Sequence, residues 1–322
     1  MNILVTGGAG FIGSHFIRYI LREHSLDTVT NLDALTYAGS LDNLKDVQKS
    51  SRYKFFKGNI CDYKFLNGLF KNNSFDAVIN FAAESHVDRS IKNPSIFVKT
   101  NVLGTNNLLD ISERSGVKTF LQISTDEVYG DSPEEGGFEE SDLLMPSSPY
   151  AASKAAADML ALSYFKTYGL NVRITRSSNN YGPNQFPEKL IPLMITHGLS
   201  GKTLPLYGDG HNKRVWLYVS DNCRAIDMVL RNGKPGEVYN ISGNDLKSNK
   251  EIAQKILSEL RINKDKIQYV KDRPGNDEIY LINDSKIRNG LNWTPAVGYN
   301  QGLKETIQWY AEHVDWWKEK II

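Results

Sequence analysis

Short runs of β-branched and aromatic residues alternate with longer amphipathic stretches over the first half of the chain. Strands buried on both faces of a parallel sheet have such continuous apolar runs, whereas the stretches between them have helical periodicity. We therefore predict an α/β fold, a Rossmann-type doubly wound parallel sheet whose ligand crevice lies outside the carboxyl ends of the strands. The predicted strands are residues 3–5, 28–32, 53–56, 77–81, 120–123 and 172–175.

The pattern loosens after about Ser178, where prolines and glycines divide the chain into short elements. This change predicts a smaller C-terminal α/β lobe that binds the substrate. Residues 216–230 and the strand-like run 238–241 could return to the main sheet, so we expect an interleaved boundary. The predicted division is a Rossmann domain at 1–177 plus about 216–241, and a smaller lobe at 178–215 and 242–322. We expect one long helix from about Tyr299 to Trp317 to close the chain.

Composition excludes several classes of partner. The chain has 322 residues, 40% of them hydrophobic, which is enough for a substantial core. Its 38 basic and 37 acidic residues leave a formal net charge of +1, so we expect neither nucleic acid nor a membrane as a partner. No apolar run approaches the roughly 20 residues that cross a bilayer, and the N-terminus lacks the features of a signal peptide. We expect a cytoplasmic protein.

The two cysteines, Cys61 and Cys223, are too few for a disulfide framework. Neither has a neighbouring Cys or His at metal-ligand spacing. We expect both to be reduced, buried and inert, and we expect no metal site.

A glycine run follows the first predicted strand. Gly7, Gly10 and Gly13 stand on the turn into the first helix, where missing Cβ atoms let the backbone approach a pyrophosphate at the helix N-terminus. The spacing is G-x-x-G-x-x-G, and an ordinary tight turn is the alternative. Asp33 ends the second strand 20 residues later, where a carboxylate can accept hydrogen bonds from an adenosine ribose. Because a 2′-phosphate would meet a like charge there, the pattern favours NAD over NADP, with a solvated strand-end Asp as the alternative.

Two further strand ends are candidate parts of the same pocket. Asn59 and Ile60 follow the third strand and could border the adenine, while Phe81, Ala82 and Ala83 could line the pocket beneath the cofactor. Close packing of helix on sheet explains the small residues equally well.

Tyr150 and Lys154 are four residues apart, so on a helix both side chains project from one face. A tyrosine with its ordinary pKa of about 10 needs a nearby cation before it can act as a base near neutral pH. The pair follows the strand end at Ser124 and Thr125 by roughly 25 residues. Together with the glycine loop, this arrangement predicts hydride and proton transfer.

With these residues the chain resembles the extended short-chain dehydrogenase/reductase superfamily, and within it the nucleoside-diphosphate-hexose 4,6-dehydratases. The resemblance runs nearly end to end. It is carried by TGGAGFIGS (6–14), LTYAG (35–39), AAESHVDRSI (82–91), STDEVYGD (124–131), SPYAASK (148–154), SNNYGP (178–183), FPEKLIP (186–192), LPLYGDG (204–210), WLYV (216–219) and DRPG (272–275).

The resemblance implies a lyase that uses NAD to convert a nucleotide hexose into its 4-keto-6-deoxy derivative. Tyr150, assisted by Lys154, takes the C4 hydroxyl proton while Thr125 holds the C4 oxygen. Glu127 then removes the C5 proton, Asp126 protonates the departing C6 hydroxyl, and hydride returns to C6. For Asp126 to be an acid at neutral pH, burial and the neighbouring carboxylate must raise its pKa. The alternative is that the two acids are an N-cap and a first-turn acid of a surface helix.

The resemblance also implies two sets of binding residues. Around NAD it places Gly7, Gly10, Phe11, Ile12, Gly13, Asp33, Leu35, Thr36, Asn59, Ile60, Phe81, Ala82, Ala83, Ser85, Thr100, Tyr150, Lys154 and Asn180. Around the nucleotide sugar it places Ser85, Thr125, Asn179, Lys189, Leu190, Pro205, Tyr207, Arg214, Asn249 and Asp272 to Asn276, which includes Arg273. Arg214, Lys189 and Arg273 are the candidates for pairing the diphosphate.

Three positions depart from the pattern of the dTDP-glucose members. Val215 stands where they commonly have Asp, Asn276 where they have His, and Glu278 where they tend to have Arg. Such changes near the nucleotide affect substrate contacts and leave the chemistry in place. The substrate is therefore dTDP-glucose or a close analogue such as UDP-GlcNAc.

Two other functions remain open at this stage. A nucleotide-sugar C4 epimerase also uses Tyr, Lys and NAD but needs no C5 base, and a redox-sensing binding protein would keep the dinucleotide fold without turnover. The resemblance further implies a homodimer in which helices at about 94–115 and 150–168 form a four-helix bundle through apolar positions such as Phe97, Leu108 and Leu109. The same positions could instead pack on the sheet.

Overall fold

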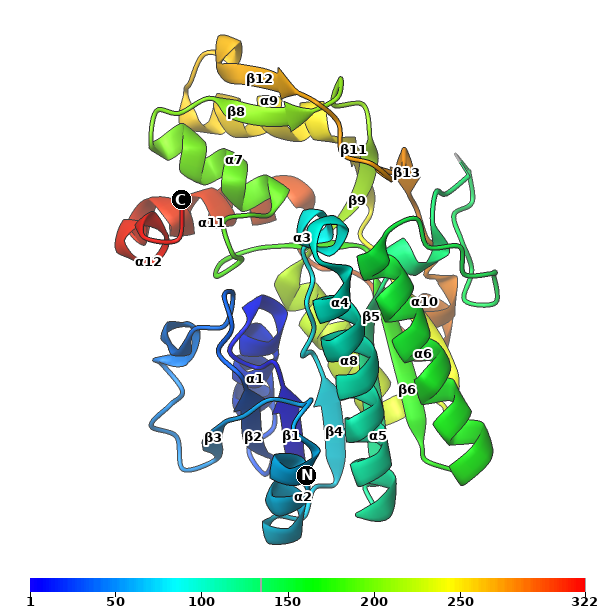
Figure 1. Ribbon diagram of the computed structural model, residues 1–322. Coiled ribbons are helices and arrows are strands. Elements are labelled where there is room, and N and C mark those ends of the chain that lie inside the picture. Colours follow the sequence, from blue (N-terminus) through cyan, green and yellow to red (C-terminus); the bar gives the residue numbers. More distant parts are fainter. Residues whose placement is uncertain (134, 322) are drawn as a thin grey trace.

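The main sheet of the computed structural model, which describes residues 1–133 and 135–321, has seven parallel strands (Figure 1). Their order is β10-β6-β5-β4-β1-β2-β3. The predicted doubly wound sheet and all six predicted strands are confirmed. The central strands are buried as a parallel sheet requires, whereas in the edge strand β3 only Tyr53 is buried. The strands are β1 (Asn2–Thr6), β2 (Thr28–Asp33), β3 (Tyr53–Lys57), β4 (Ala77–Asn80), β5 (Thr119–Thr125), β6 (Val172–Ser177) and β10 (Glu237–Ile241).

One face of the sheet is covered by α2 (Tyr63–Asn72), α5 (Thr105–Arg114) and α6 (Pro149–Tyr168). The short helices α3 (Val87–Lys92) and α4 (Pro94–Phe97) precede a π-helical turn, η2 (Val98–Gly104), which continues into α5. The helical stretch expected at about 94–115 is thus present. Its positions Phe97, Leu108 and Leu109, expected as contacts to a second subunit, are fully buried within the subunit, so the alternative of packing inside the chain is the observed one.

The opposite face of the sheet is covered by α1 (Phe11–Glu23), α8 (Val219–Asn232) and α10 (Ser285–Leu291), which share one apolar core. Helix α8 packs on this face, and β10 is the edge strand of the main sheet next to β6. Trp216, however, belongs to β9 (Lys213–Tyr218) of the smaller sheet. Ile287 and Trp293, which the division at 242–322 assigned to the smaller lobe, are fully buried against the main sheet because their apolar side chains complete the α1–α8 core.

The smaller lobe lies above the carboxyl ends of the main strands (Figure 1). Its four-stranded sheet contains β9 with β7 (Asn179–Tyr181), β11 (Asp245–Ser248) and β13 (Ile279–Tyr280), and a separate pair joins β8 (Leu204–Tyr207) to β12 (Ile267–Val270). Of these pairings only β11–β9 is antiparallel. The helices of this lobe are α7 (Leu190–Leu199), α9 (Asn249–Leu260), α11 (Tyr299–Glu312) and α12 (Val314–Lys318). Short 3₁₀ turns occur at η1 (Leu41–Leu44), η3 (Asp126–Tyr129) and η4 (Lys264–Lys266).

The expected single C-terminal helix is wrong, because the chain breaks at His313 between α11 and α12. The break lets Trp317 fold back, where its indole Nε1 donates to the Tyr310 carbonyl oxygen at 2.7 Å. Trp317 is thereby buried to 3% exposure in the apolar core of the smaller lobe. Burial of a large aromatic surface outweighs the continuation of one helix.

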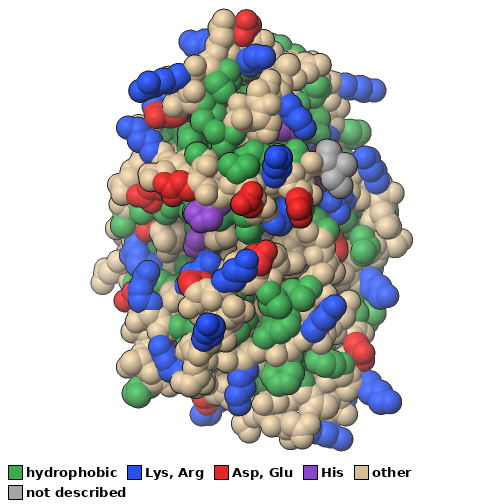
Figure 2. All heavy atoms as spheres, turned by 90° about the vertical axis from the view of Figure 1, so that its left-hand side faces the viewer, with side chains coloured by type: hydrophobic (Ala, Val, Ile, Leu, Met, Phe, Trp, Pro, Cys, Tyr) green, Lys and Arg blue, Asp and Glu red, His purple; other side chains and the backbone are tan. Residues whose placement is uncertain are grey.

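The expectation for the cysteines is half correct. Both thiols are free, and Cys223 is buried, but Cys61 is partly exposed because it lies on the loop after β3. Within residues 1–133 and 135–321 no group of three or more His, Cys, Asp or Glu side chains is arranged to hold a metal ion. No helix in the same ranges has the length and apolarity of a membrane span. On the face shown in Figure 2, basic and acidic side chains are interspersed.

Candidate active site

A cavity of about 320 Å³ opens at the carboxyl ends of the main strands and is lined by both lobes. Loops after β1, β2, β4 and β5 form one side, and the segments 177–180 and 185–189 form the other. This is the edge of a doubly wound sheet at which ligands bind. All but one of the predicted cofactor residues line it: Gly7, Gly10, Phe11, Ile12, Gly13, Asp33, Thr36, Asn59, Ile60, Phe81, Ala82, Ala83, Ser85, Thr100, Tyr150, Lys154 and Asn180.

The glycine loop approaches its neighbours too closely for any side chain. Gly7 has a φ of +70°, and a Cβ there would lie 2.6 Å from the Ala82 nitrogen. A Cβ on Gly13 would lie 2.5 Å from the Gly7 carbonyl oxygen. Helix α1 begins directly after the loop and runs for 13 residues, so its N-terminus lies at the cavity wall. The loop therefore offers the close backbone and positive partial charge that suit a pyrophosphate.

Asp33 joins the glycine loop to the loop after β2. Its Oδ2 accepts a hydrogen bond from the Ala9 amide at 2.9 Å, and its Oδ1 accepts one from the Leu35 amide at 2.7 Å. Burial raises the pKa of Asp33, and these two backbone hydrogen bonds oppose the rise. Leu35 is the predicted cofactor residue that does not line the cavity. Its φ of +52° turns the chain so that its amide serves Asp33.

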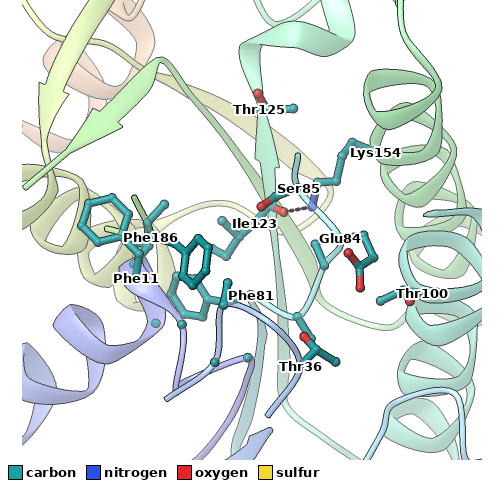
Figure 3. A pocket seen from close by; sticks show the side chains of 18 of the residues that line it. Phe11, Thr36, Phe81, Glu84, Ser85, Thr100, Ile123, Thr125, Lys154 and Phe186 are labelled. Carbon is teal, nitrogen blue, oxygen red and sulfur yellow. Dashed lines mark hydrogen bonds between the residues drawn. The ribbon is translucent and has the colours of Figure 1, made fainter. Parts of the chain in front are cut away.

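Apolar and polar side chains occupy different parts of the cavity (Figure 3). Phe11, Phe81 and Phe186 gather on one side of it. Glu84 and Lys154 lie on the other side, next to the helices. Glu84 is 7% exposed, and burial raises its pKa. An elongated ligand with one apolar and one polar portion fits this division.

Tyr150 and Lys154 occupy the first two turns of α6, and both line the cavity as predicted. The helix starts there because Ser148 caps it, accepting the Ala151 amide at 3.1 Å, with Pro149 at the first helical position. The Lys154 ammonium donates to the Ile123 carbonyl oxygen, which directs it at the end of β5 (Figure 3).

The pKa values of these two groups respond mainly to burial. Burial raises the pKa of Tyr150 well above 10, the Glu127 carboxylate raises it further, and the Thr125 hydroxyl opposes the rise. Burial also lowers the pKa of Lys154 to about 8, against the attraction of Asp158. Tyr150 is therefore a neutral phenol in the protein alone. It needs added positive charge in the cavity to lose its proton near neutral pH.

Thr125, Asp126 and Glu127 follow directly from β5 into the 3₁₀ turn η3, and all three line the cavity. The Thr125 hydroxyl accepts the Glu127 amide at 3.3 Å and donates to Asp126 Oδ1 at 3.2 Å. Burial and the Glu127 carboxylate raise the pKa of Asp126 to about 7. The predicted causes, burial and the neighbouring carboxylate, are both present around Asp126, which is 3% exposed and does not lie on a surface helix.

Three of the predicted substrate residues form one cluster in the smaller lobe. Asn276 Oδ1 accepts hydrogen bonds from Arg214 Nη2 and from Arg273 Nε, each at 3.2 Å. Arg214 is 5% exposed, donates to the Asp277 carbonyl oxygen at 2.8 Å, and lies 3.9 Å from the centre of the Tyr280 ring. Burial raises the pKa of Glu127, and both arginines and Lys189 oppose the rise, so the cluster lies within electrostatic reach of the acid pair.

Lys189 and Tyr207 connect the smaller lobe to the loop after β4. The Lys189 ammonium donates to the Ser85 carbonyl oxygen, and both residues line the cavity. The Tyr207 hydroxyl donates to Asp88 Oδ2 at 2.8 Å. Asp88 also lies 4.0 Å from an Arg273 guanidinium nitrogen. These contacts join Tyr207 and Arg273 of the smaller lobe to the segment after β4, part of which lines the cavity.

The structure brings only part of the predicted substrate set to the cavity wall. Ser85, Thr125, Asn179 and Lys189 line it. Leu190 and Asn249 are the first residues of α7 and α9, and Pro205 lies in β8. The remaining predicted residues outside the wall, all in the smaller lobe, are Tyr207, Arg214 and the segment 272–276.

Several residues of the cavity wall were not singled out from the sequence. Glu84 follows Ala82 and Ala83, Tyr37 lies in the loop after β2, and Glu188 precedes Lys189. An Arg89 guanidinium nitrogen lies 3.3 Å from the Glu188 carboxylate, and the same guanidinium lies 3.7 Å from the centre of the Tyr37 ring. Each residue lies within one of the matching motifs, which is the signal that could have identified it.

Comparison with known proteins defines the family. Residues 4–306 match the family model described as GDP-mannose 4,6 dehydratase. The chain belongs to the GDP-mannose 4,6-dehydratase family. Within this family it is similar to the dTDP-glucose 4,6-dehydratase of Streptomyces niveus, with 48% identity over 322 residues that cover 99% of this chain and 95% of that protein. The predicted family resemblance is thus confirmed.

Solved structures of similar proteins share the complete fold. The dTDP-glucose 4,6-dehydratase of Bacillus anthracis, in complex with NAD, is 50% identical with a TM-score of 0.93, covering 99% of each chain. DesIV, a dTDP-glucose 4,6-dehydratase from Streptomyces venezuelae with NAD and TYD bound, is 47% identical with a TM-score of 0.96, covering 99% of this chain and 100% of that one. The family's dinucleotide fold is therefore present from end to end in this member.

Proposed function

We propose that this chain is an NAD-dependent nucleotide-sugar 4,6-dehydratase, a hydro-lyase that converts dTDP-glucose into dTDP-4-keto-6-deoxyglucose. The observation that carries the proposal is the acid pair of buried Asp126 and half-buried Glu127 in the same cavity as Tyr150 and Lys154. A simple alcohol dehydrogenase or a C4 epimerase needs the tyrosine and the lysine but has no use for a second acid and base. The full-length similarity to dTDP-glucose 4,6-dehydratases supports the same reaction.

The cavity fits NAD. We propose that the Gly7–Gly13 loop holds the pyrophosphate at the start of α1, and that Asp33 accepts the adenosine ribose hydroxyls. Thr36, Asn59 and Ile60 border the adenine end of the cavity. When bound, NAD supplies a hydride acceptor for the sugar C4 and a donor for C6, together with positive charge on the nicotinamide. Residues of the cavity wall perform the remaining steps.

Oxidation at C4 begins with removal of the hydroxyl proton. We assign this step to Tyr150, since its hydroxyl lies in the cavity beside the Thr125 hydroxyl. The Lys154 ammonium, one turn further along α6, stabilises the resulting phenolate together with the cofactor's charge. Thr125 donates a hydrogen bond to the C4 oxygen and holds it in place.

The C4 ketone acidifies the C5 hydrogen and makes elimination possible. Glu127 removes the C5 proton, and Asp126 donates a proton to the departing C6 hydroxyl, which leaves as water. A proton then returns to C5 and hydride to C6. C4 ends oxidised and C6 ends reduced, so the hydride taken from C4 is returned and no cofactor is consumed. The elimination step releases one water.

The diphosphate needs local positive charge because the protein as a whole is nearly neutral. We propose that Arg214, Arg273 and Lys189 supply it, with the nucleotide lying in the smaller lobe. We propose that residues 1–177, 219–241 and 285–293 form the NAD-binding lobe. The rest of the chain then forms the lobe that binds the nucleotide sugar. Asn276 and Glu278 leave UDP-GlcNAc as an alternative substrate for the same mechanism.

One assay tests the proposal. The purified protein is incubated with dTDP-glucose, UDP-glucose, UDP-GlcNAc and a GDP-hexose, and the products are analysed by mass spectrometry. We expect dTDP-glucose to lose the mass of one water. A product of unchanged mass with inverted C4 would instead identify an epimerase. Loss of water from UDP-GlcNAc alone would reassign the substrate and leave the mechanism intact.

We further propose a homodimer formed through the helices α4, α5 and α6, which lie side by side in Figure 1. Apolar side chains outside the subunit core remain exposed along this side, including Val98 at 56%, Leu103 at 48% and Met159 at 49%. Replacing Leu103 with Glu should convert a dimer into a monomer in light scattering. A monomeric wild-type protein would contradict the assignment. Free cysteines and the use of NAD support a cytoplasmic location.

A further inference from the structure

A buried arginine beneath the cavity contacts both elements that carry the proposed catalytic residues. Arg176, on β6, is 2% exposed, and its Nε donates to Asp158 Oδ2 at 2.9 Å. Its Nη1 donates to the Tyr129 hydroxyl at 2.8 Å, and the guanidinium lies 4.8 Å from the centre of the Tyr129 ring. The proposed mechanism uses none of these three side chains.

The sheet register brings the partners of Arg176 into one row. Ser124 on β5 and Asn240 on β10 are its register neighbours on either side. The Ser124 hydroxyl donates to Asp158 Oδ2 at 3.0 Å, and the Tyr129 hydroxyl donates to Asn240 Oδ1 at 2.9 Å. A continuous hydrogen-bonded chain therefore crosses three strands directly below the cavity.

One end of this chain is the catalytic helix. Asp158 is fully buried on α6, four residues after Lys154, which is itself four residues after Tyr150. The three side chains thus follow one face of the helix. Asp158 is the anionic group that attracts the Lys154 ammonium. Asp158 therefore stabilises the Lys154 ammonium from the same face of α6 that carries Tyr150.

The other end of the chain is the turn that carries the acid and base. Tyr129 is the last residue of η3, three residues after Asp126 and two after Glu127. Its ring stacks on Phe138 at 5.2 Å, and its hydroxyl is held between Arg176 and Asn240. Four residues of 3₁₀ turn have few hydrogen bonds of their own, so a side-chain anchor decides where the turn lies.

We propose that Arg176, Asp158 and Tyr129 form a positioning brace that sets the tyrosine and lysine of α6 against the acid and base of η3. The brace rests on the proposed dehydratase function, because oxidation and elimination must use one bound sugar without its release. A displacement of about 1 Å between catalytic groups can cost 10²-fold in rate, which is why a buried anchor for both elements matters. The contact from Arg176 to Tyr129 serves the elimination step, and the contact from Arg176 to Asp158 serves the oxidation step.

The test removes the contact at Tyr129 and the charge at Asp158 in separate variants. Tyr129→Phe removes only the hydroxyl that links the turn to Arg176, and Asp158→Asn removes the charge that faces Lys154. Tyr239→Phe is the matched control, because it removes the hydroxyl of a neighbouring buried tyrosine, which accepts the Lys234 amide and contacts neither catalytic element. Replacing Arg176 itself is a poor first experiment, since it leaves Asp158 charged and unpaired in the interior.

Rapid mixing of the NAD-loaded enzyme with dTDP-glucose follows both steps through the absorbance of reduced nicotinamide. In Tyr129→Phe, elimination should slow roughly 10-fold with KM within about twofold, so that reduced cofactor accumulates. In Asp158→Asn, the oxidation step should slow instead. The pH above which the oxidation rate falls should become lower, because the Lys154 ammonium loses the carboxylate that attracts it. The charged and titratable groups around that site are Glu84 on the loop after β4, Asp158 and Tyr150 on α6, Arg176 on β6, and Asp126 and Glu127 on η3. Tyr239→Phe should leave both steps unchanged.

A second readout needs no turnover. Hydrogen–deuterium exchange of the amides at 126–130 should be faster in Tyr129→Phe than in wild type or Tyr239→Phe. If both rates and this exchange match wild type, the brace is disproved. If Tyr129→Phe and Tyr239→Phe slow both steps equally, the effect is general destabilisation and the proposal also fails. A wild-type protein without dehydratase activity would overturn the proposed function, while the exchange result would still decide the brace.

Discussion

Asp126 and Glu127 are adjacent carboxyls on one short turn, yet Asp126 is buried whereas Glu127 is half-buried. Burial and the Glu127 carboxylate raise the pKa of Asp126 to about 7, and Arg214, the Thr125 hydroxyl and a backbone hydrogen bond oppose the rise. Arg273, Lys189 and Arg214 together oppose the rise for Glu127. Asp126 Oδ2 and Glu127 Oε2 are buried without a hydrogen-bond partner among residues 1–133 and 135–321. Two neighbouring carboxyls in different fields are suited to be one acid and one base.

Replacing Glu127 with Gln separates elimination from oxidation. The amide keeps the size of the side chain but cannot take the C5 proton, so dehydration should fall by about 10²- to 10⁴-fold. Reduced nicotinamide should still form on mixing with dTDP-glucose. Glu139→Gln, an exposed change on the following loop, is the control and should behave as wild type. Full dehydratase activity in Glu127→Gln would remove this residue from the mechanism.

The two chemical steps should differ in their pH dependence. Asp126 must be protonated to release water, and its pKa is about 7, so the elimination rate should fall as pH rises through about 7. Oxidation needs protonated Lys154, whose pKa is about 8, so its rate should fall about one pH unit later. Single-turnover measurements across this range resolve both limbs. Coincident limbs, or elimination that accelerates with rising pH, would contradict the assignment of Asp126 as the acid.

Asn276→Ala should weaken substrate binding without slowing chemistry. The Asn276 carbonyl oxygen accepts from both Arg214 and Arg273, and loss of hydrogen bonds to charged groups costs about 1.5–3 kcal/mol. Because Arg214 keeps its backbone carbonyl partners, the free-energy cost should lie at the lower end of this range. KM should therefore rise roughly 10-fold, with kcat nearly unchanged. Asn263→Ala is the control, since it is an exposed residue of the same lobe whose side-chain amide donates to Asp265. A change in kcat alone would place Asn276 in a different role.

Gly7→Ala should abolish stable binding of the cofactor. The backbone at Gly7 has a φ of +70°, and the added Cβ would lie 2.6 Å from the Ala82 nitrogen, so the loop must move. The purified variant should contain little NAD and unfold at a lower temperature. Gly68→Ala provides the contrast: it lies within α2 with nothing within 4 Å of the added Cβ, and should stabilise the protein by about 0.5–1 kcal/mol. Normal NAD content in Gly7→Ala would exclude the loop as the pyrophosphate site.

Local features of the sequence were sufficient for the main sheet and for several of the residues that line the cavity. The apolar runs predicted all six strands, and the glycine spacing, Asp33 and the Tyr150–Lys154 interval identified residues that the structure brings to one cavity. These features depend on neighbours within a few positions, because strand burial, a tight turn and one helical face are short-range properties. The break at His313 escaped prediction, since it depends on a distant burial site for Trp317.

The sequence by itself determined the sheet, the glycine loop and the residue types needed for oxidation and elimination. Only the tertiary structure decided which distant side chains meet, such as Arg214 with Asn276, or Arg176 with both Asp158 and Tyr129. It also decided the pKa of Asp126, because burial and the summed charge around a carboxyl depend on every element packed against it. The hydrophobic periodicity of a sequence predicts short-range structure such as strands and helices. The pKa values in a site depend instead on contacts between residues that lie tens of positions apart in the sequence.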